Sequence, residues 1–476
     1  MEYFTMVARI YFGSQEAQGN NYQDRVSPYS GETVSRFPLC SAEDTKKALL
    51  IAKEATKEAK KTTIAQRCEW LLDVAQKLKE HKEDMAKTIT DEVGKPITFS
   101  RIEVERCIET ITLSVETMRT MHGETINTDA MKSGKKSISY FLREPAGVVV
   151  AITPFNFPLN LIAHKLAPAL VAGNTVVLKP TPEAPLTAYK FAKLFIDSPY
   201  AIKDALSVVY GDAEVGSALV ESDIPRVISF TGSVAVGNII AKSAGIKKVS
   251  LELGGNAATY IDSGADLDLA SKRCAMGAFV NSGQVCISLQ RIYVNAKIYD
   301  EFAAKMAYES SKLIVGSPYE DDTFMGPLIN DEACQRAMKW VQSAIGEGAT
   351  PMLAPKVDGR IFYPCVMTDV RDDMAIVCEE VFAPIVSLIK VDSFDEAISK
   401  INDSPYGLQF SVFTNDLSIT KRAIYELDAG GVVINDMPTL RFDIQPYGGV
   451  KLSGIGREGP RFAIEEMSEI KSVVIC

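Results

Sequence analysis

The chain has 476 residues, which is more than one hydrophobic core usually holds, so its length predicts two or three domains. Apolar residues make up 46% and charged residues 24% of the chain, values typical of a water-soluble globular protein. The formal net charge of -10 argues against a nucleic acid or an anionic membrane as partner, because a broadly acidic surface repels both.

Cysteine and histidine usage limits the chemistry that the chain can perform. The nine cysteines include no Cys-x-x-Cys pair, and the first residues lack the basic and apolar segments of a signal peptide. We therefore expect reduced thiols in a cytoplasmic protein. Three histidines are too few to favour a histidine-based site, so no metal is expected. The most apolar window, 147–178, is interrupted by prolines and polar residues, which predicts buried core and no membrane span.

The N-terminal part of the chain is predicted to be helical. Ser41 and Asp44 have the spacing of a capping box, and small apolar residues follow at helical intervals. A second helical run covers 64–93 and ends at Gly94. Lys95 is expected to be a cation at the C-terminus of that helix.

Beyond residue 128 the pattern changes. The polar segment 129–143 ends in an alternating strand over 137–142, which predicts an arm reaching away from the core. Short apolar strands then alternate with helices; the expected strands are 148–152, 176–178, 206–210, 227–230 and 249–251, and the expected helices include 185–196 and 235–244. Unbroken apolar strands predict a parallel sheet covered on both faces. A second alternating set after residue 253 predicts a second α/β domain.

Three polar residues next to expected strands or glycine turns are candidates for chemistry. Cys286 follows Gly283 by three residues and is either a buried structural cysteine or a nucleophilic thiolate. Glu252 ends an apolar strand beside two glycines, where desolvation would raise its pKa and suit it as a general base; the alternative is a salt-bridged glutamate. Asn156 follows another strand and is either a turn residue or a donor to a developing oxyanion.

Two glycine motifs differ in what they predict. In Phe230-Thr231-Gly232-Ser233, a strand leads through a tight turn into a helix, an arrangement that presents backbone N–H groups to a pyrophosphate. The literal Gly-x-Gly-x-x-Gly at 454–459 has no preceding strand in the expected pattern and no βαβ unit after it. We therefore do not interpret that second motif as a dinucleotide site.

Seven segments together resemble the aldehyde dehydrogenase superfamily over nearly the whole chain. They are PFNFP (154–158), VVLKP (176–180), FTGSVAVG (230–237), LELGG (251–255), GQVC (283–286), EEVFAP (379–384) and PYGGVKLSG (446–454). The resemblance implies an α/β fold with a Rossmann-like NAD(P)-binding domain (1–119 and 144–250) and a catalytic α/β domain (251–445). It also implies a small β oligomerisation arm with the C-terminal segment (120–143 and 446–476) in a homodimer or homotetramer.

The resemblance also implies the catalytic roles. Cys286 would attack the aldehyde, while the Asn156 amide and the Cys286 backbone N–H would hold the oxyanion. Hydride transfer would then leave a thioester on Cys286, and Glu252 would activate the water that hydrolyses it. An aldehyde has no hydride to give until a nucleophile makes its carbon tetrahedral.

The implied cofactor is NAD or NADP. The matching positions are Thr153, Pro154, Lys179, Gly211, Phe230, Gly232, Ser233, Glu380 and Phe382. Among these, Lys179 matches the lysine at the adenosine ribose, Gly232 and Ser233 the pyrophosphate turn, and Glu380 and Phe382 the nicotinamide ribose and ring. NAD-preferring relatives carry a glutamate where Pro182 stands here, with Glu183 one residue late, so NADP is at least as plausible as NAD.

The expected substrate is a small hydroxy- or acid-bearing aldehyde, with lactaldehyde first. Succinate semialdehyde and glyceraldehyde 3-phosphate are alternatives, although Val285 stands where the glyceraldehyde-phosphate enzymes often have an arginine. Arg441 is either a clamp for a substrate anion or a surface arginine paired with Asp443. His164 is the second substrate candidate, ahead of Arg106 and Arg291.

Two other functions compete with hydrolytic aldehyde oxidation. A CoA-acylating relative would generally lack a base like Glu252. A protein that kept the fold for a structural or binding role would tend to lose Cys286 or Glu252. Because both residues are present, the sequence favours the oxidising enzyme.

Overall fold

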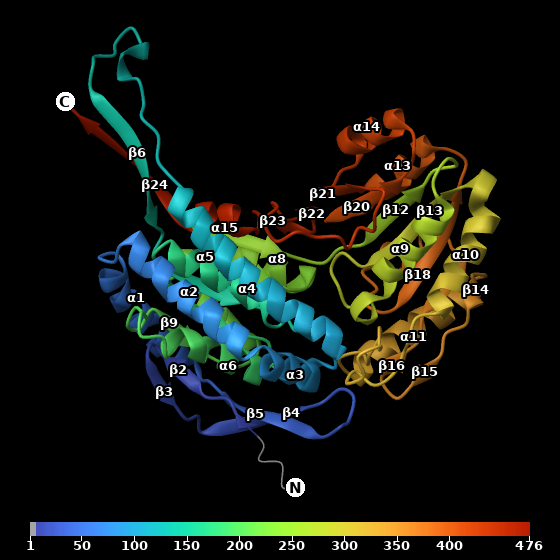
Figure 1. The fold of residues 1–476 in the computed structure, drawn as a ribbon, viewed down its shortest axis with the longest axis horizontal. Coiled ribbons are helices and arrows are strands. Elements are labelled where there is room, and N and C mark those ends of the chain that lie inside the picture. Colours follow the sequence, from blue (N-terminus) through green and yellow to red (C-terminus); the bar gives the residue numbers. More distant parts are fainter. Residues whose placement is uncertain (1–5) are drawn as a thin grey trace.

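The structure, a computed structural model, describes residues 6–476 (Figure 1). Its helices are α1 (Ala42–Ala59), α2 (Ile64–Glu80), α3 (Lys82–Val93), α4 (Ile97–Thr120), α5 (Asn160–Val171), α6 (Pro185–Ile196), α7 (Ala213–Glu221), α8 (Val234–Ser243), α9 (Leu267–Phe279), α10 (Tyr299–Ser311), α11 (Asp331–Gly346), α12 (Ala375–Cys378), α13 (Phe394–Asn402), α14 (Leu417–Glu426) and α15 (Pro460–Glu466). Short 3-10 helices are η1 (Thr128–Ala130), η2 (Val280–Gly283) and η3 (Ala296–Ile298).

The strands fall into two large sheets and several small ones. They are β1 (Met6–Val7), β2 (Ile10–Phe12), β3 (Gln15–Ala17), β4 (Asn21–Val26), β5 (Thr33–Leu39), β6 (Ile138–Pro145), β7 (Val148–Ile152), β8 (Thr175–Lys179), β9 (Leu206–Val208), β10 (Val227–Thr231), β11 (Lys248–Glu252), β12 (Ala257–Ile261), β13 (Leu289–Asn295), β14 (Thr350–Leu353), β15 (Val357–Asp358), β16 (Ile361–Phe362), β17 (Cys365–Thr368), β18 (Ile385–Val391), β19 (Tyr406–Gly407), β20 (Gln409–Phe413), β21 (Gly431–Ile434), β22 (Val450–Lys451), β23 (Gly454–Ile455) and β24 (Ser468–Ile475).

The first large sheet has the order β23-β11-β10-β7-β8-β9-β2-β3, and its five central strands are parallel. Alternate residues of β7 enter different cores. Val149 and Ala151 pack with helices α2–α6, whereas Val148 and Val150 pack with α1, α7 and α8. The prediction of a parallel sheet covered on both faces is confirmed, because a strand buried on both sides must be apolar throughout.

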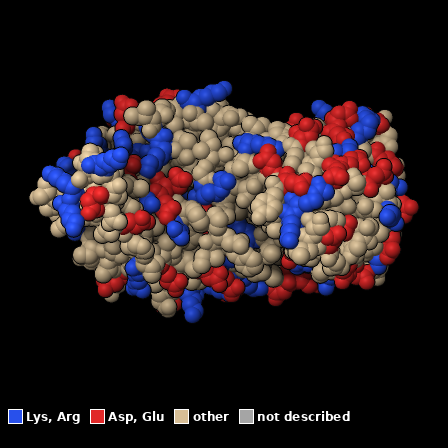
Figure 2. Space-filling model, turned by 90° about the horizontal axis from the view of Figure 1, so that it is seen from above, with Lys and Arg blue, Asp and Glu red and all other residues tan. Residues whose placement is uncertain are grey.

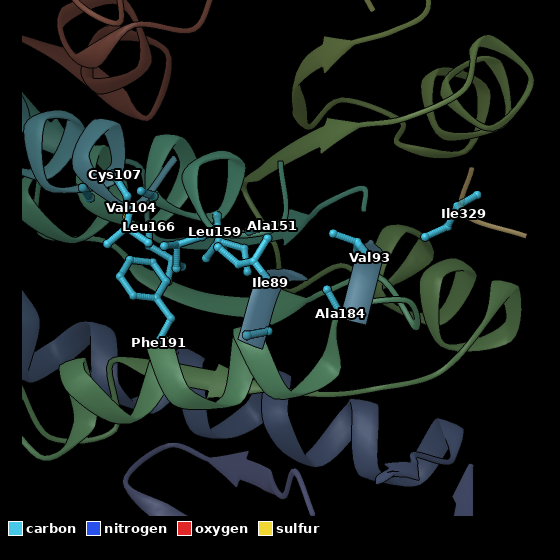
Figure 3. Close-up of a cluster of buried hydrophobic side chains, with 14 of the residues drawn as sticks. Ile89, Val93, Val104, Cys107, Ala151, Leu159, Leu166, Ala184, Phe191 and Ile329 are labelled. Atoms are coloured by element: carbon cyan, nitrogen blue, oxygen red, sulfur yellow. The ribbon is translucent and has the colours of Figure 1, made fainter. Parts of the chain in front are cut away.

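The larger of these two cores joins the β7 face to four helices (Figure 3). Figure 3 shows side chains of α3, α4, α5 and α6 meeting at this level, among them Ile89, Val104, Leu166 and Phe191. Each of these four side chains is fully buried. Their close packing fixes α5 and the turn before it, which carries Asn156.

The second large sheet has the order β14-β17-β18-β13-β12-β20-β21, with only β14 antiparallel to its neighbour. The expected second α/β domain is therefore present. In Figure 1 it lies beside the first, and the chain crosses between them just after β11.

The predicted arm is a two-stranded ribbon that stands away from the rest of the chain (Figure 1). Strand β6 pairs antiparallel with β24 over eight residues, from Ile138↔Ile475 to Pro145↔Ser468. The C-terminal segment makes two short pairings before it reaches this arm. Strand β22 pairs with β19 in a separate two-stranded sheet, and β23 pairs with β11 at the edge of the first large sheet. Residues 446–458 are thereby laid over the end of β11, where Glu252 lies.

Three predictions about the N-terminal part need correction. Residues 6–39 contain strands β1–β5, where we predicted helix. Strand β2 pairs with β3, and β5 pairs with β1 and β4, while Tyr11 of β2 also pairs with distant Val208 of β9. The helical run 64–93 is divided at His81, which ends α2 and precedes α3. Lys95 is no solvated helix-terminal cation, because it is 1% exposed and pairs with buried Glu103.

Other local predictions are confirmed. Ser41 and Asp44 form the capping box of α1, and Gly94 ends α3 with φ +69°. Helix α6 has the predicted limits, and β7 covers 148–152 as predicted. All nine cysteines are free thiols.

Surface charge and helix composition bear on the partners of the protein. Acidic and basic side chains are interspersed over the face shown in Figure 2. Within residues 6–476, no helix combines the length and the apolar composition needed to cross a membrane.

Candidate active site

A cavity of about 470 Å³ brings both large sheets and the C-terminal segment together. Its walls include Asn156, Glu252 and Cys286, the three residues predicted to carry the chemistry. The cavity lies at the carboxyl ends of β10 and β11. In the sheet, strand β7 lies between β8 and β10. The chain runs from β7 outward through β8 and β9 on one side, and then returns to β10 on the other side. Such a reversal of strand order is where open α/β sheets bind ligands.

Asn156 is held by a buried network beneath its turn. The Glu103 carboxylate accepts hydrogen bonds from the backbone N–H groups of Leu159 (2.9 Å) and Asn160 (3.1 Å) at the start of α5. Lys95 pairs with the same carboxylate, and its Nζ lies 3.9 Å from the Phe157 ring centroid. One N–H of the Asn156 amide donates to the Gln284 carbonyl at 3.0 Å. The Asn156 amide is thereby fixed to the backbone of Gln284, two residues before Cys286.

Glu252 is a buried carboxyl group without a partner. It is 3% exposed, and neither of its carboxyl oxygens has a hydrogen-bond partner among residues 6–476. Burial, with the neighbouring Glu458 carboxylate, raises the pKa of Glu252 well above its ordinary value. The positive charges of Arg441, Lys165 and Arg457 oppose that shift but do not reverse it. This group is therefore a candidate proton acceptor in a water-poor site.

Cys286 follows a strained turn. Asn281 and Ser282 have φ of 52° and 56°, and Gly283 follows with φ 72°. Left-handed backbone is costly for residues with a side chain, and such strain clusters at functional sites. Gly255 allows the Cys286 backbone to approach, since a Cβ there would lie 2.3 Å from the Cys286 carbonyl oxygen.

The Cys286 thiol faces a hydroxyl group in the cavity. Its Sγ lies 3.0 Å from the Tyr447 Oη. Burial raises the pKa of Cys286 to about 11, while the Tyr447 hydrogen bond and the Arg441 charge oppose the rise. The thiol thus needs assistance to ionise near neutral pH.

The predicted cofactor residues lie along the carboxyl edge of the first sheet. Thr153 follows β7, Lys179 ends β8, and Gly232 and Ser233 link β10 to α8. Ser233 is the N-cap of α8, whose N-terminus therefore lies at the cavity wall. Phe230 lies beneath the turn, where a Cβ on Gly232 would be 2.5 Å from its ring.

Glu380 and Phe382 reach the same cavity from the second sheet's side. A Cβ on Gly254 would lie 2.3 Å from a Glu380 carboxyl oxygen, so the glycine makes room for that side chain. Burial raises the pKa of Glu380 to about 7. Phe382 has φ +49° and packs edge-on against Phe155, with ring centroids 6.0 Å apart.

Arg441 lies in the cavity wall and is not a surface residue, with its side chain only 11% exposed. Its guanidinium lies 3.7 Å from the Tyr447 ring centroid and 3.2 Å from a Glu458 carboxylate oxygen. Asp443 lies 3.6 Å from it. The predicted Asp443 contact is present, but within a buried cluster.

Asp443 organises the other side of that cluster. It accepts two hydrogen bonds from Arg106, at 2.9 and 2.7 Å, and lies 3.0 Å from His164 Nε2. Although burial opposes the change, His164 and Arg106 hold the pKa of Asp443 well below its usual range. His164 is 1% exposed and lies behind Arg441, away from the cavity wall. Arg291 lies elsewhere, donating to the Asn256 carbonyl at 2.9 Å.

Comparison with known proteins identifies the arrangement. A family model described as "Aldehyde dehydrogenase family" matches residues 15–473. This chain belongs to the aldehyde dehydrogenase family. It is therefore an NAD(P)-dependent aldehyde dehydrogenase, as the sequence motifs predicted.

Three relatives show the breadth of this branch. The chain is 42% identical over 451 residues to the 3-sulfolactaldehyde dehydrogenase of Priestia aryabhattai, covering 94% of each chain. It is 39% identical over 456 residues to the lactaldehyde dehydrogenase of Methanococcus aeolicus, covering 94% of this chain and 96% of the relative. The crystal structure of the glyceraldehyde-3-phosphate dehydrogenase GapN from Methanocaldococcus jannaschii, complexed with NADP, matches with a TM-score of 0.91 and 38% identity, over 96% of this chain and 99% of that one.

The residues of this aldehyde dehydrogenase fit a nicotinamide dinucleotide. The Thr153 hydroxyl is buried without a partner among the described residues, at the carboxyl edge of the first sheet. Ser233 opens helix α8 at the cavity wall, and Gly254 makes room for Glu380. A buried free hydroxyl, a helix N-terminus and a carboxylate at one edge suit the hydroxyl and phosphate groups of NAD(P).

Sequence reasoning missed several cavity residues. Tyr447 was noted only as part of a turn, and Glu458 only within the discounted glycine motif. Lys165 donates to Glu458 at 3.0 Å, and a lysine inside the apolar helix α5 was the available signal. Arg336 and Trp340 of α11 also line the cavity, and nothing local in the sequence marks them.

The raised pKa of Glu252 predicts how Glu252→Gln changes stability with pH. In the folded wild type the carboxyl keeps a proton that the unfolded chain releases above about pH 4.3. Wild-type stability at this site is therefore lost as pH rises from that value through the raised folded pKa. Glutamine has no proton to lose, so the thermal midpoint of the variant relative to wild type should increase between pH 5 and 9.

Differential scanning calorimetry across that pH range measures the effect. Glu105→Gln is the control, since Glu105 lies on α4 with its side chain 57% exposed. A Glu252→Gln difference that stays as flat as the control would contradict a protonated, buried Glu252.

Proposed function

We propose that this enzyme oxidises a small hydroxy- or acid-bearing aldehyde to the carboxylic acid through a thioester on Cys286. The observation that carries the proposal is the meeting of three groups in one cavity: the half-buried Cys286 thiol, the unpartnered Glu252 carboxyl and the Arg441 guanidinium. Nucleophile, base and substrate anchor are thereby available in a single water-poor space.

The first step is addition of the Cys286 thiolate to the aldehyde. A sulfur–carbon bond forms, and the electron pair of the carbonyl π bond moves to its oxygen. One N–H of Asn156 is bound to the Gln284 carbonyl, which leaves the second to donate to this oxyanion, with the Cys286 backbone N–H as the other donor. Fixing the amide beforehand avoids reorganisation as the charge develops.

The second step is hydrolysis of the thioester. A bound nicotinamide supplies the hydride acceptor between the two steps. Glu252 first releases its proton to solvent. The carboxylate then takes a proton from water, the hydroxide oxygen bonds to the acyl carbon, and Cys286 leaves as the thiolate. The presence of this base supports release to water and weighs against a CoA-acylating enzyme.

Charge in the cavity cluster supports a negatively charged substrate. Lys165, Arg106 and Arg441 are paired with only two ionised carboxylates, Asp443 and Glu458, while Glu252 is held protonated by burial. These three cations outnumber the two ionised carboxylates with which they pair, so this cluster carries a net positive charge. Burial lowers the pKa of the His164 imidazole, so it adds no charge near neutral pH.

A monoanionic hydroxyaldehyde or aldehyde acid satisfies this excess. The relative named for 3-sulfolactaldehyde handles a substrate that carries a sulfonate. Lactaldehyde, first in our sequence prediction and named in another relative, has the hydroxyl but no charge. We therefore place an anionic analogue of lactaldehyde ahead of lactaldehyde itself.

The cofactor is NAD or NADP, and we propose that NADP supports turnover. Pro182 supplies no carboxylate at the position that favours NAD, and Glu183 accepts a hydrogen bond from Thr181. Lys179 ends β8 at this edge of the site, close enough to Glu183 for their charges to interact. The NADP complex of a 38%-identical relative supports the same proposal.

We also propose that the chain forms a homo-oligomer through its arm and lies in the cytoplasm. Strands β6 and β24 form a two-stranded ribbon with exposed Ile138, Ile470 and Val474, and an isolated ribbon of this kind is marginally stable. This supports a homodimer or homotetramer in which the arm packs on another copy. Nine free thiols support a reducing, cytoplasmic location.

Initial rates of nicotinamide reduction test the function. NAD and NADP are each tested with lactaldehyde, 3-sulfolactaldehyde, succinate semialdehyde, glyceraldehyde 3-phosphate and propanal. We expect the highest kcat/KM for a monoanionic substrate, and we expect turnover with NADP. Cys286→Ala should bind the cofactor normally and lack turnover. A preference for propanal would contradict the charge argument, and turnover by Cys286→Ala would contradict the nucleophile.

Arg441→Gln tests the substrate anchor. Losing one charge-assisted contact should raise KM about tenfold or more for a monoanionic aldehyde and change KM for propanal by less than about threefold. Arg461→Gln is the control, because the Arg461 side chain is 70% exposed on α15. Equal increases in KM for charged and uncharged aldehydes would show that Arg441 does not bind the substrate anion.

A further inference from the structure

Tyr447 touches the reacting atom of the proposed mechanism. Its Oη lies 3.0 Å from Cys286 Sγ, within hydrogen-bond distance for a sulfur partner. Its side chain lines the cavity and packs in a small apolar cluster with Val285, Ile287 and Leu408. A phenylalanine would fill this cluster equally well, so packing alone does not account for the hydroxyl.

The phenol is held in place by its own backbone. The Tyr447 N–H donates to the Glu458 carbonyl at 3.1 Å, and the Glu458 N–H donates to the Tyr447 carbonyl at 2.6 Å. These two bonds form a bridge across the C-terminal segment that β23 ties to β11. A tyrosine has only two side-chain torsions, so a fixed backbone and a packed ring leave its hydroxyl little freedom.

The surroundings make the phenol a donor and the thiol an acceptor. Burial raises the pKa of the Tyr447 hydroxyl well above its ordinary value, so this group keeps its proton. The Arg441 guanidinium lies over the ring at 3.7 Å from its centroid, where a positive charge draws electron density from the ring. The other titratable groups that face Cys286 are Glu252 and Glu380, and a negative charge on either one disfavours a negative sulfur.

We propose that Tyr447 is a catalytic residue whose phenol donates a hydrogen bond to the Cys286 thiolate, with Arg441 stacked on its ring to strengthen that donor. This inference rests on the proposed role of Cys286 as the nucleophile. The phenol keeps its proton throughout: as sulfur bonds to the aldehyde carbon, the hydrogen bond weakens because the sulfur charge moves to the carbonyl oxygen. Arg441 therefore serves the substrate anion and the nucleophile together.

The pH dependence of alkylation tests the proposal on the full-length enzyme. Iodoacetamide modification of Cys286 is followed by peptide mass spectrometry, which separates it from the other eight cysteines. Tyr447→Phe should raise the apparent pKa of Cys286 by about one unit or more, because a hydrogen bond to the charged form is lost. Tyr260→Phe is the matched control, since Tyr260 is 1% exposed and accepts a hydrogen bond from Asn295.

Ultraviolet absorbance of the thiolate, taken as the difference from Cys286→Ala, gives the same pKa without depending on reagent entry. An unchanged pKa in Tyr447→Phe by both methods would overturn the proposal, even with Cys286 fully alkylated and essential. Turnover by Cys286→Ala would instead overturn the proposed function, while the pKa shift would still establish the hydrogen bond to sulfur.

Discussion

Removal of ionisable groups from water is the constraint on which this site depends. Glu252 and Cys286 both lie at a junction of two parallel sheets, where burial raises the pKa of each group. A protonated carboxyl costs less to bury than a carboxylate, and in the proposed mechanism Glu252 acts as a base only after it has lost its proton. The thiol has the opposite need, because it must be ionised to react. The cavity therefore has to disfavour charge on one group and support it on the other.

The C-terminal segment supplies polar groups that act differently on Glu252 and Cys286. Strand β23 pairs with β11, which places Tyr447 and Glu458 over Glu252. Glu458 repels a second negative charge on Glu252, while the Tyr447 hydroxyl lies within hydrogen-bond distance of the Cys286 sulfur. The segment thus acts on both groups although it is distant from them in sequence, and its fixed position follows from strand pairing.

Much of this site was predictable because its residues follow strands. Asn156, Glu252 and the turn at Gly232 and Ser233 come directly after apolar runs, and the carboxyl ends of parallel strands meet at one edge. What the sequence did not indicate depends on contacts between distant residues. Lys95 can be buried because Glu103 lies beside it, strand β2 joins the first large sheet by pairing with distant β9, and Trp340 reaches the cavity through the packing of α11.

The acyl group on Cys286 is the central claim of this account, and Glu252→Gln tests it most directly. The variant is mixed with NADP and a monoanionic hydroxyaldehyde, quenched, and examined by intact-protein and peptide mass spectrometry. We predict a burst of reduced cofactor close to one equivalent per chain, slow turnover afterwards, and the acyl mass on the peptide containing Cys286. Unimpaired steady-state turnover, or an acyl group on any other residue, would contradict the account.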